Sequence, residues 1–187
     1  PHQIDAALFA FKSPLSKGVV LADEVGLGKT IEAGLVLCQM WSTGKRKIII
    51  VCPASLRKQW SFELAEKFGI ASEILDAKVF NAYVAEGKNT FSYNRVIICS
   101  YNFAAKKKAE VLRHGFDLAI VDEAHKLRNV YRKSARTAAD VRDALAGTKK
   151  LLLTATPFQN SLMELYGLTT VIDPNFFGSE KTFRRDY

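Results

Sequence analysis

Short apolar runs recur along this chain between longer stretches that have the period of a helix. Several runs are apolar at every position, including IIIVC at 48–52, LAIV at 118–121 and LLL at 151–153. Strands without polar alternation are buried on both faces, as in a parallel sheet covered by crossover helices. The pattern predicts six strands, at Gly18–Ala22, Lys47–Cys52, Ser72–Leu75, Arg95–Cys99, Phe116–Val121 and Lys150–Thr154.

Between the predicted strands, apolar residues three to four positions apart indicate amphipathic helices. One such stripe contains Trp60, which we therefore expect in the core rather than as a stacking platform for bases. Strands that alternate with helices predict an α/β fold, a three-layer sandwich with a mostly parallel central sheet. The segment after Asp173 is less regular. The two stripes are Leu56, Trp60, Leu64 and Phe68, and Ala138, Val141 and Leu145.

Composition restricts the class of protein. The 187 residues are 48% hydrophobic and 25% charged, which fits one globular domain with an ordinary core. Cys38, Cys52 and Cys99 are odd in number and form no CxxC pair, so we expect reduced thiols in a cytoplasmic protein and no zinc site. No apolar run reaches the roughly 18 residues of a membrane span, so no membrane partner is expected.

The chain is basic. Its 27 Lys and Arg residues outnumber 19 Asp and Glu residues, for a net charge of +8. An excess of positive charge favours an anionic partner, and nucleic acid and nucleotide fit best. A well-solvated basic surface explains the charge equally well, so the choice depends on motifs.

The strongest motif is ADEVGLGKT at 22–30, which lies between a predicted strand and a helical run. Glycines such as Gly26 and Gly28 let backbone N–H groups surround a phosphate. Lys29 then reaches the outer phosphate oxygens, and Thr30 offers a hydroxyl to Mg²⁺. The usual pattern has Gly where Asp23 stands. The motif predicts a phosphate-binding loop.

A second motif, FDLAIVDEAH at 116–125, ends a buried strand with two acids. Ligands bind at the carboxyl ends of strands in open α/β sheets. Asp122 would hold Mg²⁺ and Glu123 would polarise the attacking water as general base. We expect the two acids to point in opposite directions, as adjacent strand residues do.

A third segment, LLLTATPFQN at 151–160, again passes from strand to turn. Hydroxyls of Thr154 and Thr156 at the sheet edge can relay a change at the terminal phosphate. The motif is chemically weak, because Pro157 ends a strand in any protein.

Together these segments resemble the first RecA-like domain of superfamily 2 helicases, specifically the Swi/Snf-type translocase ATPases. DEVGLGKT at 23–30 resembles that family's motif I, in which Asp is usual at position 23. DEAH at 122–125 resembles motif II, and TATPFQN at 154–160 resembles motif III. VCPASLRKQW at 51–60 and ICSYN at 98–102 resemble motifs Ia and Ib, and PHQ at 1–3 resembles the adenine-contacting Q motif.

The resemblance implies roles residue by residue. ATP would be bound by His2, Gln3, Asp23, Val25, Gly26, Leu27, Gly28, Lys29 and Thr30. Catalysis would depend on Lys29, Asp122 and Glu123, with Mg²⁺ as cofactor at Thr30 and Asp122. Nucleotide state would be coupled to motif III through His125, Thr154, Thr156 and Asn160. Nucleic acid would contact Ser55, Arg57, Lys58, Ser100 and Tyr101, with the run Lys106–Lys108 as a weaker candidate.

Nothing in the sequence resembles motifs IV to VI. We therefore expect residues 1–187 to be a helicase ATP-binding domain whose second RecA-like domain, with its arginine fingers, lies elsewhere in a longer chain. Such an isolated domain would be nearly inactive as an ATP hydrolase. The expected function is DNA translocation, most simply on duplex DNA. An RNA helicase, a restriction or defence motor, and a slow nucleotide-gated interaction module remain alternatives. ADEVGLGKTIEAGLVL is similar to bacterial members related to an RNA-polymerase-recycling ATPase, which adds RNA polymerase as a partner to consider.

Overall fold

The computed structural model of the chain describes residues 16–22, 29–91, 94–156 and 162–186. In this part of the chain six strands form one sheet in the order β1-β6-β5-β2-β4-β3, and every pairing is parallel. The strands are β1 (Gly18–Ala22), β2 (Ile48–Cys52), β3 (Ser72–Leu75), β4 (Val96–Ser100), β5 (Leu118–Asp122) and β6 (Lys149–Thr154).

The predicted α/β sandwich is confirmed, and each predicted strand is present: β1 and β3 have the predicted bounds, and the other four differ by one or two residues at their ends. Strand β2 begins at Ile48, one residue later than predicted, because the Lys47 backbone N–H bonds to a side chain. The Lys47 N–H donates to Asp117 Oδ2 at 3.1 Å. The Asp117 N–H donates to the Lys47 carbonyl at 2.7 Å. These bonds fasten the starts of β2 and β5 together.

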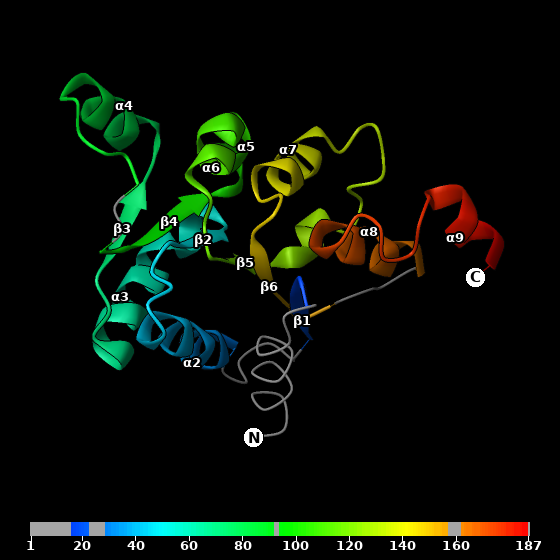
Figure 1. The fold of residues 1–187 in the computed structure, drawn as a ribbon, viewed down its shortest axis with the longest axis horizontal. Helices are drawn as coiled ribbons and strands as arrows, with labels where there is room; N and C mark the ends of the chain where they lie inside the picture. Colours follow the sequence, from blue (N-terminus) through cyan, green and yellow to red (C-terminus); the bar gives the residue numbers. More distant parts are fainter. Residues whose placement is uncertain (1–15, 23–28, 92–93, 157–161, 187) are drawn as a thin grey trace.

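Helices cover both faces of the sheet (Figure 1). On one face lie α2 (Lys29–Ser42) and α3 (Arg57–Phe68), with the short 3₁₀ segment η1 (Ala54–Leu56) before α3. The other face carries α4 (Ala77–Ala85), α5 (Tyr101–Lys106), α6 (Lys108–His114), α7 (Arg136–Ala144) and α8 (Leu162–Ile172). The short segment η2 (Ala124–Leu127) follows β5, and α9 (Glu180–Asp186) lies near the C-terminus.

Two separate cores result from this arrangement. In β2, Ile48 and Ile50 pack toward α2 and α3, whereas Ile49 and Val51 pack toward the helices of the opposite face. All four side chains are fully buried. The absence of polar alternation in the sequence is thus explained by helices on both sides.

The apolar stripe of α3 is a core element, as predicted. Trp60 and Leu64 are 3% and 0% exposed. Leu56 and Phe68 are partly buried against the same core. Gly34 of α2 allows the close contact with α3, because a Cβ there would lie 2.1 Å from the Phe68 ring. This contact fixes α3 beside the start of α2.

The three cysteines are free thiols, as the sequence predicted. Cys52 and Cys99 are fully buried in adjacent strands. Burial raises the pKa of Cys52 to about 12, and the nearby Asp122 carboxylate adds to this effect. The Cys52 thiol is therefore protonated and unreactive at neutral pH.

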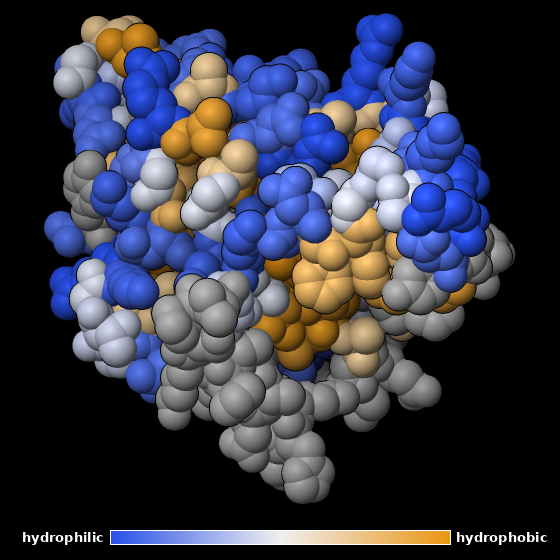
Figure 2. All heavy atoms as spheres, turned by 45° about the vertical axis from the view of Figure 1, so that its right-hand side comes forward, coloured by the Kyte–Doolittle hydropathy of each residue, from blue (hydrophilic) through white to orange (hydrophobic). Residues whose placement is uncertain are grey.

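The less regular C-terminal segment forms α9, which packs on α8 through an aromatic group of Tyr166, Phe177 and Phe183. Figure 2 shows hydrophobic residues gathered beside hydrophilic ones on the face that includes these helices. Leu162 and Phe176 are 48% and 67% exposed. None of the helices that the structure describes is both long and apolar enough to span a bilayer.

Candidate nucleotide and nucleic-acid site

The predicted phosphate-site residues meet at one edge of the sheet. Because all strands run parallel, the carboxyl end of β5 and the start of α2, the helix that follows β1, lie at the same edge. A pocket of about 470 Å³ is lined there by Lys29, Thr30, Asp122 and Glu123. Gln59, Trp60, Glu63 and Lys67 of α3 close its side. The structure therefore brings together the predicted cation, hydroxyl and two carboxylates.

Some predicted ATP contacts lie outside the described residues. These are His2, Gln3, Asp23, Val25, Gly26, Leu27 and Gly28, together with the coupling residue Asn160. Their roles stay predictions from the resemblance.

Asp122 has both carboxylate oxygens held by N–H donors. The Glu123 backbone N–H donates to Oδ1 at 2.9 Å, and Trp60 Nε1–H donates to Oδ2 at 2.9 Å. Burial raises the pKa of Asp122, and the charge of Glu123 acts in the same direction. The two hydrogen bonds and the Lys29 charge oppose that rise. A partly desolvated carboxylate of fixed orientation is suited to bind a cation.

Glu123 adopts a left-handed backbone conformation, with φ 55° and ψ 45°. It is the only non-glycine residue with positive φ in the described part of the chain. The strand ends at Asp122, so the turn at Glu123 sets the direction of this second acid. This differs from the expected alternation along a strand, because the left-handed turn replaces the next strand residue. Strain of this kind is typical of functional sites.

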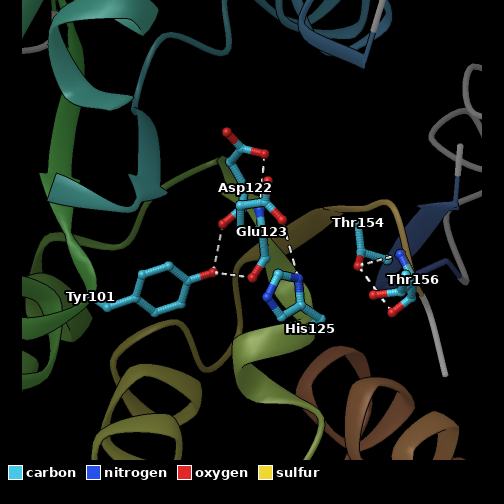
Figure 3. A network of polar contacts seen from close by, with 6 residues as sticks. All are labelled: Tyr101, Asp122, Glu123, His125, Thr154 and Thr156. Atoms are coloured by element: carbon cyan, nitrogen blue, oxygen red, sulfur yellow. Dashed lines mark hydrogen bonds and ion pairs between the residues drawn. The ribbon is translucent and has the colours of Figure 1, made fainter. Parts of the chain in front are cut away.

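His125 and Tyr101 both point toward Asp122 and Glu123, the acidic pair (Figure 3). His125 Nδ1 lies 3.1 Å from Glu123 Oε2. The Tyr101 hydroxyl donates to the backbone carbonyls of Asp122 and Glu123 at 2.6 and 3.1 Å. Burial holds the pKa of Tyr101 well above its ordinary range, so this hydroxyl keeps its proton and remains a donor. Tyr101 thus holds the backbone of Asp122 and Glu123, and His125 lies beside the Glu123 side chain.

Two predicted coupling residues, Thr154 at the end of β6 and Thr156 just after it, form a closed turn at the same edge of the sheet. Thr154 is fully buried, and its hydroxyl accepts from the Thr156 N–H and donates to the Thr156 carbonyl, each at 3.2 Å. Figure 3 shows this turn beside His125 and the acidic pair. The relay function of Thr154, Thr156 and His125 stays a prediction.

The donors in the pocket fit Mg²⁺. Mg²⁺ prefers oxygen ligands and is commonly held by one or two carboxylates together with substrate phosphates. Asp122 and Thr30 provide such oxygens in one pocket. Within the described ranges there is no group of three or more His, Cys, Asp or Glu residues that could hold a metal by itself.

The predicted nucleic-acid segments also converge. Motif Ia begins in the last two residues of β2, and motif Ib begins in the last three residues of β4, the neighbouring strand. A second pocket, of about 350 Å³, is lined by Pro53, Ala54, Ser100, Tyr101 and residues of η2 and α7. Ser55 and Lys58 are exposed beside it on η1 and α3.

Individual nucleic-acid candidates differ in how available they are. Arg57 is partly buried, and its Nε–H donates to the Ala54 carbonyl at 3.1 Å. Ser100 caps α5 by accepting from the Phe103 N–H at 3.2 Å. Tyr101 is only 8% exposed, so its structural role at the acidic pair leaves little surface for a nucleic-acid contact.

The lysine run is mainly a paired helix surface. Lys107 lies 3.3 Å from Glu110 and over the Phe80 ring, and Lys108 lies 2.7 Å from Asp140. Lys106 is exposed. The run supplies less unpaired positive charge than its sequence suggested.

Sequence reasoning missed what α3 contributes to the pocket. Trp60 was expected only as a core residue, yet its indole N–H reaches Asp122. Glu63 accepts from Gln59 at 2.9 Å and from Lys67 at 3.0 Å along the pocket wall. The spacing of four residues among Gln59, Glu63 and Lys67 was a visible signal for these pairs.

Comparisons with known proteins agree with this architecture. The chain is 36% identical to the Uncharacterized ATP-dependent helicase YqhH of Bacillus subtilis over its whole length, which is 31% of that protein. It is 33% identical to the RNA polymerase-associated protein RapA of Sodalis glossinidius, over 98% of this chain and 19% of that protein. The chain thus spans about a third or less of these relatives.

Among solved structures, the Sulfolobus solfataricus SWI2/SNF2 ATPase core in complex with dsDNA matches the fold. The TM-score is 0.77 at 22% identity, over all of this chain and 38% of that one. Residues 2–187 match the SNF2-related domain. This match covers nearly every residue, including both acids of the pocket and the whole of α3, and the chain therefore belongs to the SNF2-related domain family.

Proposed function

We propose that this chain binds Mg²⁺-ATP and hydrolyses it as one lobe of a motor that moves along duplex DNA. The observation that carries the proposal is the pocket in which Lys29, Thr30, Asp122 and Glu123 meet. A cation for phosphate, a hydroxyl and carboxylate for the metal, and a second carboxylate for water are the parts that phosphoryl transfer needs.

Each residue has one role in this proposal. Lys29 binds the terminal phosphate oxygens, and Thr30 and Asp122 hold Mg²⁺. The bound metal supplies charge neutralisation at the phosphates. Glu123 orients the attacking water and accepts its proton, and His125 Nδ1 lies 3.1 Å from its carboxylate.

Duplex DNA is the proposed track. The relative from Sulfolobus solfataricus is described as an ATPase core in complex with dsDNA. Exposed Ser55 and Lys58 with Arg57 form a polar and basic margin at the start of α3. Contacts of this type to phosphates carry no sequence information, which suits a motor that moves over any sequence.

The proposal includes a second lobe and partners. A second RecA-like domain would supply an arginine finger to the open pocket, and such a residue is worth about 10³–10⁵ in rate for related reactions. RapA is described as RNA polymerase-associated, which supports RNA polymerase as a candidate partner. The proposed location is the cytoplasm.

Two variants test the assigned roles. Lys29→Ala should abolish tight Mg²⁺-ATP binding, because the phosphate loses its side-chain cation. Glu123→Gln should bind ATP nearly as well as wild type while hydrolysis stops. Nucleotide affinity and turnover are measured separately, with fluorescent ATP and with phosphate release. Equal loss of affinity in both variants would contradict the assignment.

A comparison of nucleic acids tests the proposed track. The ATPase rate of the full-length protein is measured with duplex DNA, single-stranded DNA and RNA. Duplex DNA should stimulate the most. Stronger stimulation by RNA would support an RNA helicase instead. The chain of residues 1–187 alone should turn over far below the roughly 1–100 per second of typical kinases.

A further inference from the structure

Two segments predicted to contact nucleic acid each send one side chain to the acidic pair. From α3, Trp60 Nε1–H donates to Asp122 Oδ2 at 2.9 Å. From the start of α5, the Tyr101 hydroxyl donates to the carbonyls of Asp122 and Glu123. The Trp60 contact spans 62 positions in sequence, and the two Tyr101 contacts span 21 and 22.

Trp60 is held firmly where it makes this bond. Its side chain is 3% exposed and packs in the same core as Leu64 and Ile50. A buried indole N–H requires an acceptor, and here the acceptor is a carboxylate rather than a backbone carbonyl. The indole N–H thus adds a directed bond to the packing of the ring.

The Trp60 bond fixes how Asp122 presents its oxygens to the pocket. With one N–H donor on each oxygen, the carboxylate cannot rotate without breaking a bond. The lone pairs not used by these donors remain for a cation. Groups that orient a metal ligand in this way commonly change metal affinity or activity by about 10–100-fold when removed.

The same helix begins at the DNA margin, the polar and basic surface of Ser55, Arg57 and Lys58 that we propose to contact DNA. Arg57 is the first residue of α3, and Trp60 follows one turn later. Ser55 lies in η1, which leads directly into α3. No other segment lies between these residues and Trp60 along the chain. At the start of α5, the N-cap Ser100 is a predicted nucleic-acid contact, and the next residue, Tyr101, bonds to the acidic pair.

We propose that Trp60 is a positioning residue for the Asp122 carboxylate, and that Trp60 and Tyr101 transmit DNA binding to the acidic pair. This rests on the proposed function. It adds a direct route from the DNA margin to the metal ligand, separate from the turn of Thr154 and Thr156. Trp60 acts on the carboxylate and Tyr101 acts on the backbone of the turn.

The first test is Trp60→Phe in the full-length protein. It keeps an aromatic ring and deletes the N–H donor. The matched control is Trp41→Phe, because Trp41 packs against the same core from α2 and lies under Arg46 rather than at Asp122. Binding of a fluorescent ATP analogue is titrated with Mg²⁺ in both variants and in wild type, so the readout does not depend on turnover.

In Trp60→Phe the Mg²⁺ concentration at half-maximal binding should rise by about 10–100-fold. Binding to duplex DNA should be unchanged, and stimulation of the ATPase by DNA should fall toward one. Trp41→Phe should match wild type in all three measurements. A Trp60→Phe protein with the thermal stability of Trp41→Phe and an unchanged Mg²⁺ midpoint would overturn the positioning role.

If Trp60→Phe does not fold, benzothienylalanine at position 60 replaces only the indole N–H with sulfur and preserves the ring shape. The same rise in Mg²⁺ midpoint is expected. An unchanged midpoint in this variant also overturns the proposal.

Tyr101→Phe tests the second contact, and Tyr83→Phe is its control because the Tyr83 hydroxyl pairs with Glu73 away from the pocket. Tyr101→Phe should lower kcat with DNA by about tenfold or more and leave the Mg²⁺ midpoint unchanged. A kcat equal to that of Tyr83→Phe would overturn the role of Tyr101. If wild type is not stimulated by DNA, the proposed function fails, whereas the Mg²⁺ titration still decides the positioning role of Trp60.

Discussion

The left-handed backbone at Glu123 should lower the free energy of unfolding, and this cost can be measured. Its φ of 55° is unfavourable for any residue with a Cβ and is unstrained for glycine. Comparing Glu123→Gly with Glu123→Ala isolates the backbone, because both variants lack the carboxylate and its contact with His125. We expect the glycine variant to be the more stable of the two, although both should be inactive as ATPases.

The magnitude follows from two opposing terms. A left-handed conformation costs a residue with a Cβ about 1–2 kcal/mol, which glycine avoids. Glycine also gives the unfolded chain more conformational freedom, which costs about 0.4–1 kcal/mol relative to alanine. The two ranges leave an expected net gain of about 0–1.6 kcal/mol, with about 0.8 kcal/mol at their midpoints. For a chain of this length, each kcal/mol shifts Tm by about 2–4 °C.

The assay is urea unfolding of residues 1–187 with both variants. Ala65→Gly is the control, since Ala65 is an exposed residue in the interior of α3 with helical backbone. There glycine should destabilise by about 1 kcal/mol. If Glu123→Gly were no more stable than Glu123→Ala while the control lost stability as expected, the strain assigned to the turn would be refuted.

Three further outcomes are expected. Burial lowers the pKa of Lys150 to about 8, below its value in the unfolded chain, so the unfolded state binds more protons above that pH and stability should rise from pH 8 toward 10. Lys150→Met should remove this rise and be the more stable at pH 7 by urea unfolding. Gly167→Ala should destabilise by about 1–3 kcal/mol in the same assay, because its Cβ would lie 1.7 Å from the Arg128 carbonyl oxygen of η2's C-cap. In duplex binding across a salt series, Arg57→Ala should flatten the slope of log affinity against log salt by about 0.9 if it contacts one phosphate, on any sequence. Lys45→Ala, before β2 and so at the opposite end of the sheet, should not change that slope.

The strands, and the meeting of Lys29, Thr30, Asp122 and Glu123 at one edge of the sheet, could be predicted from the sequence. Strands buried on both faces must be apolar throughout, so IIIVC at 48–52 identified β2 without knowledge of its neighbours. Lys29 and Asp122 were recognisable because Lys29 comes after a strand and Asp122 stands at the end of one, and the ends of parallel strands share one edge of the sheet. These are local patterns, which one sequence records in full.

The order of the strands was decided only by the tertiary structure. Because β5 pairs with β2, the helix after β2 lies beside the end of β5, and Trp60 meets Asp122 across 62 residues. No local spacing encodes that contact, and apolar periodicity marked Trp60 only as core. The left-handed turn at Glu123 is equally hidden, because glutamate has no preference for positive φ and adopts it only where the surrounding bonds impose it.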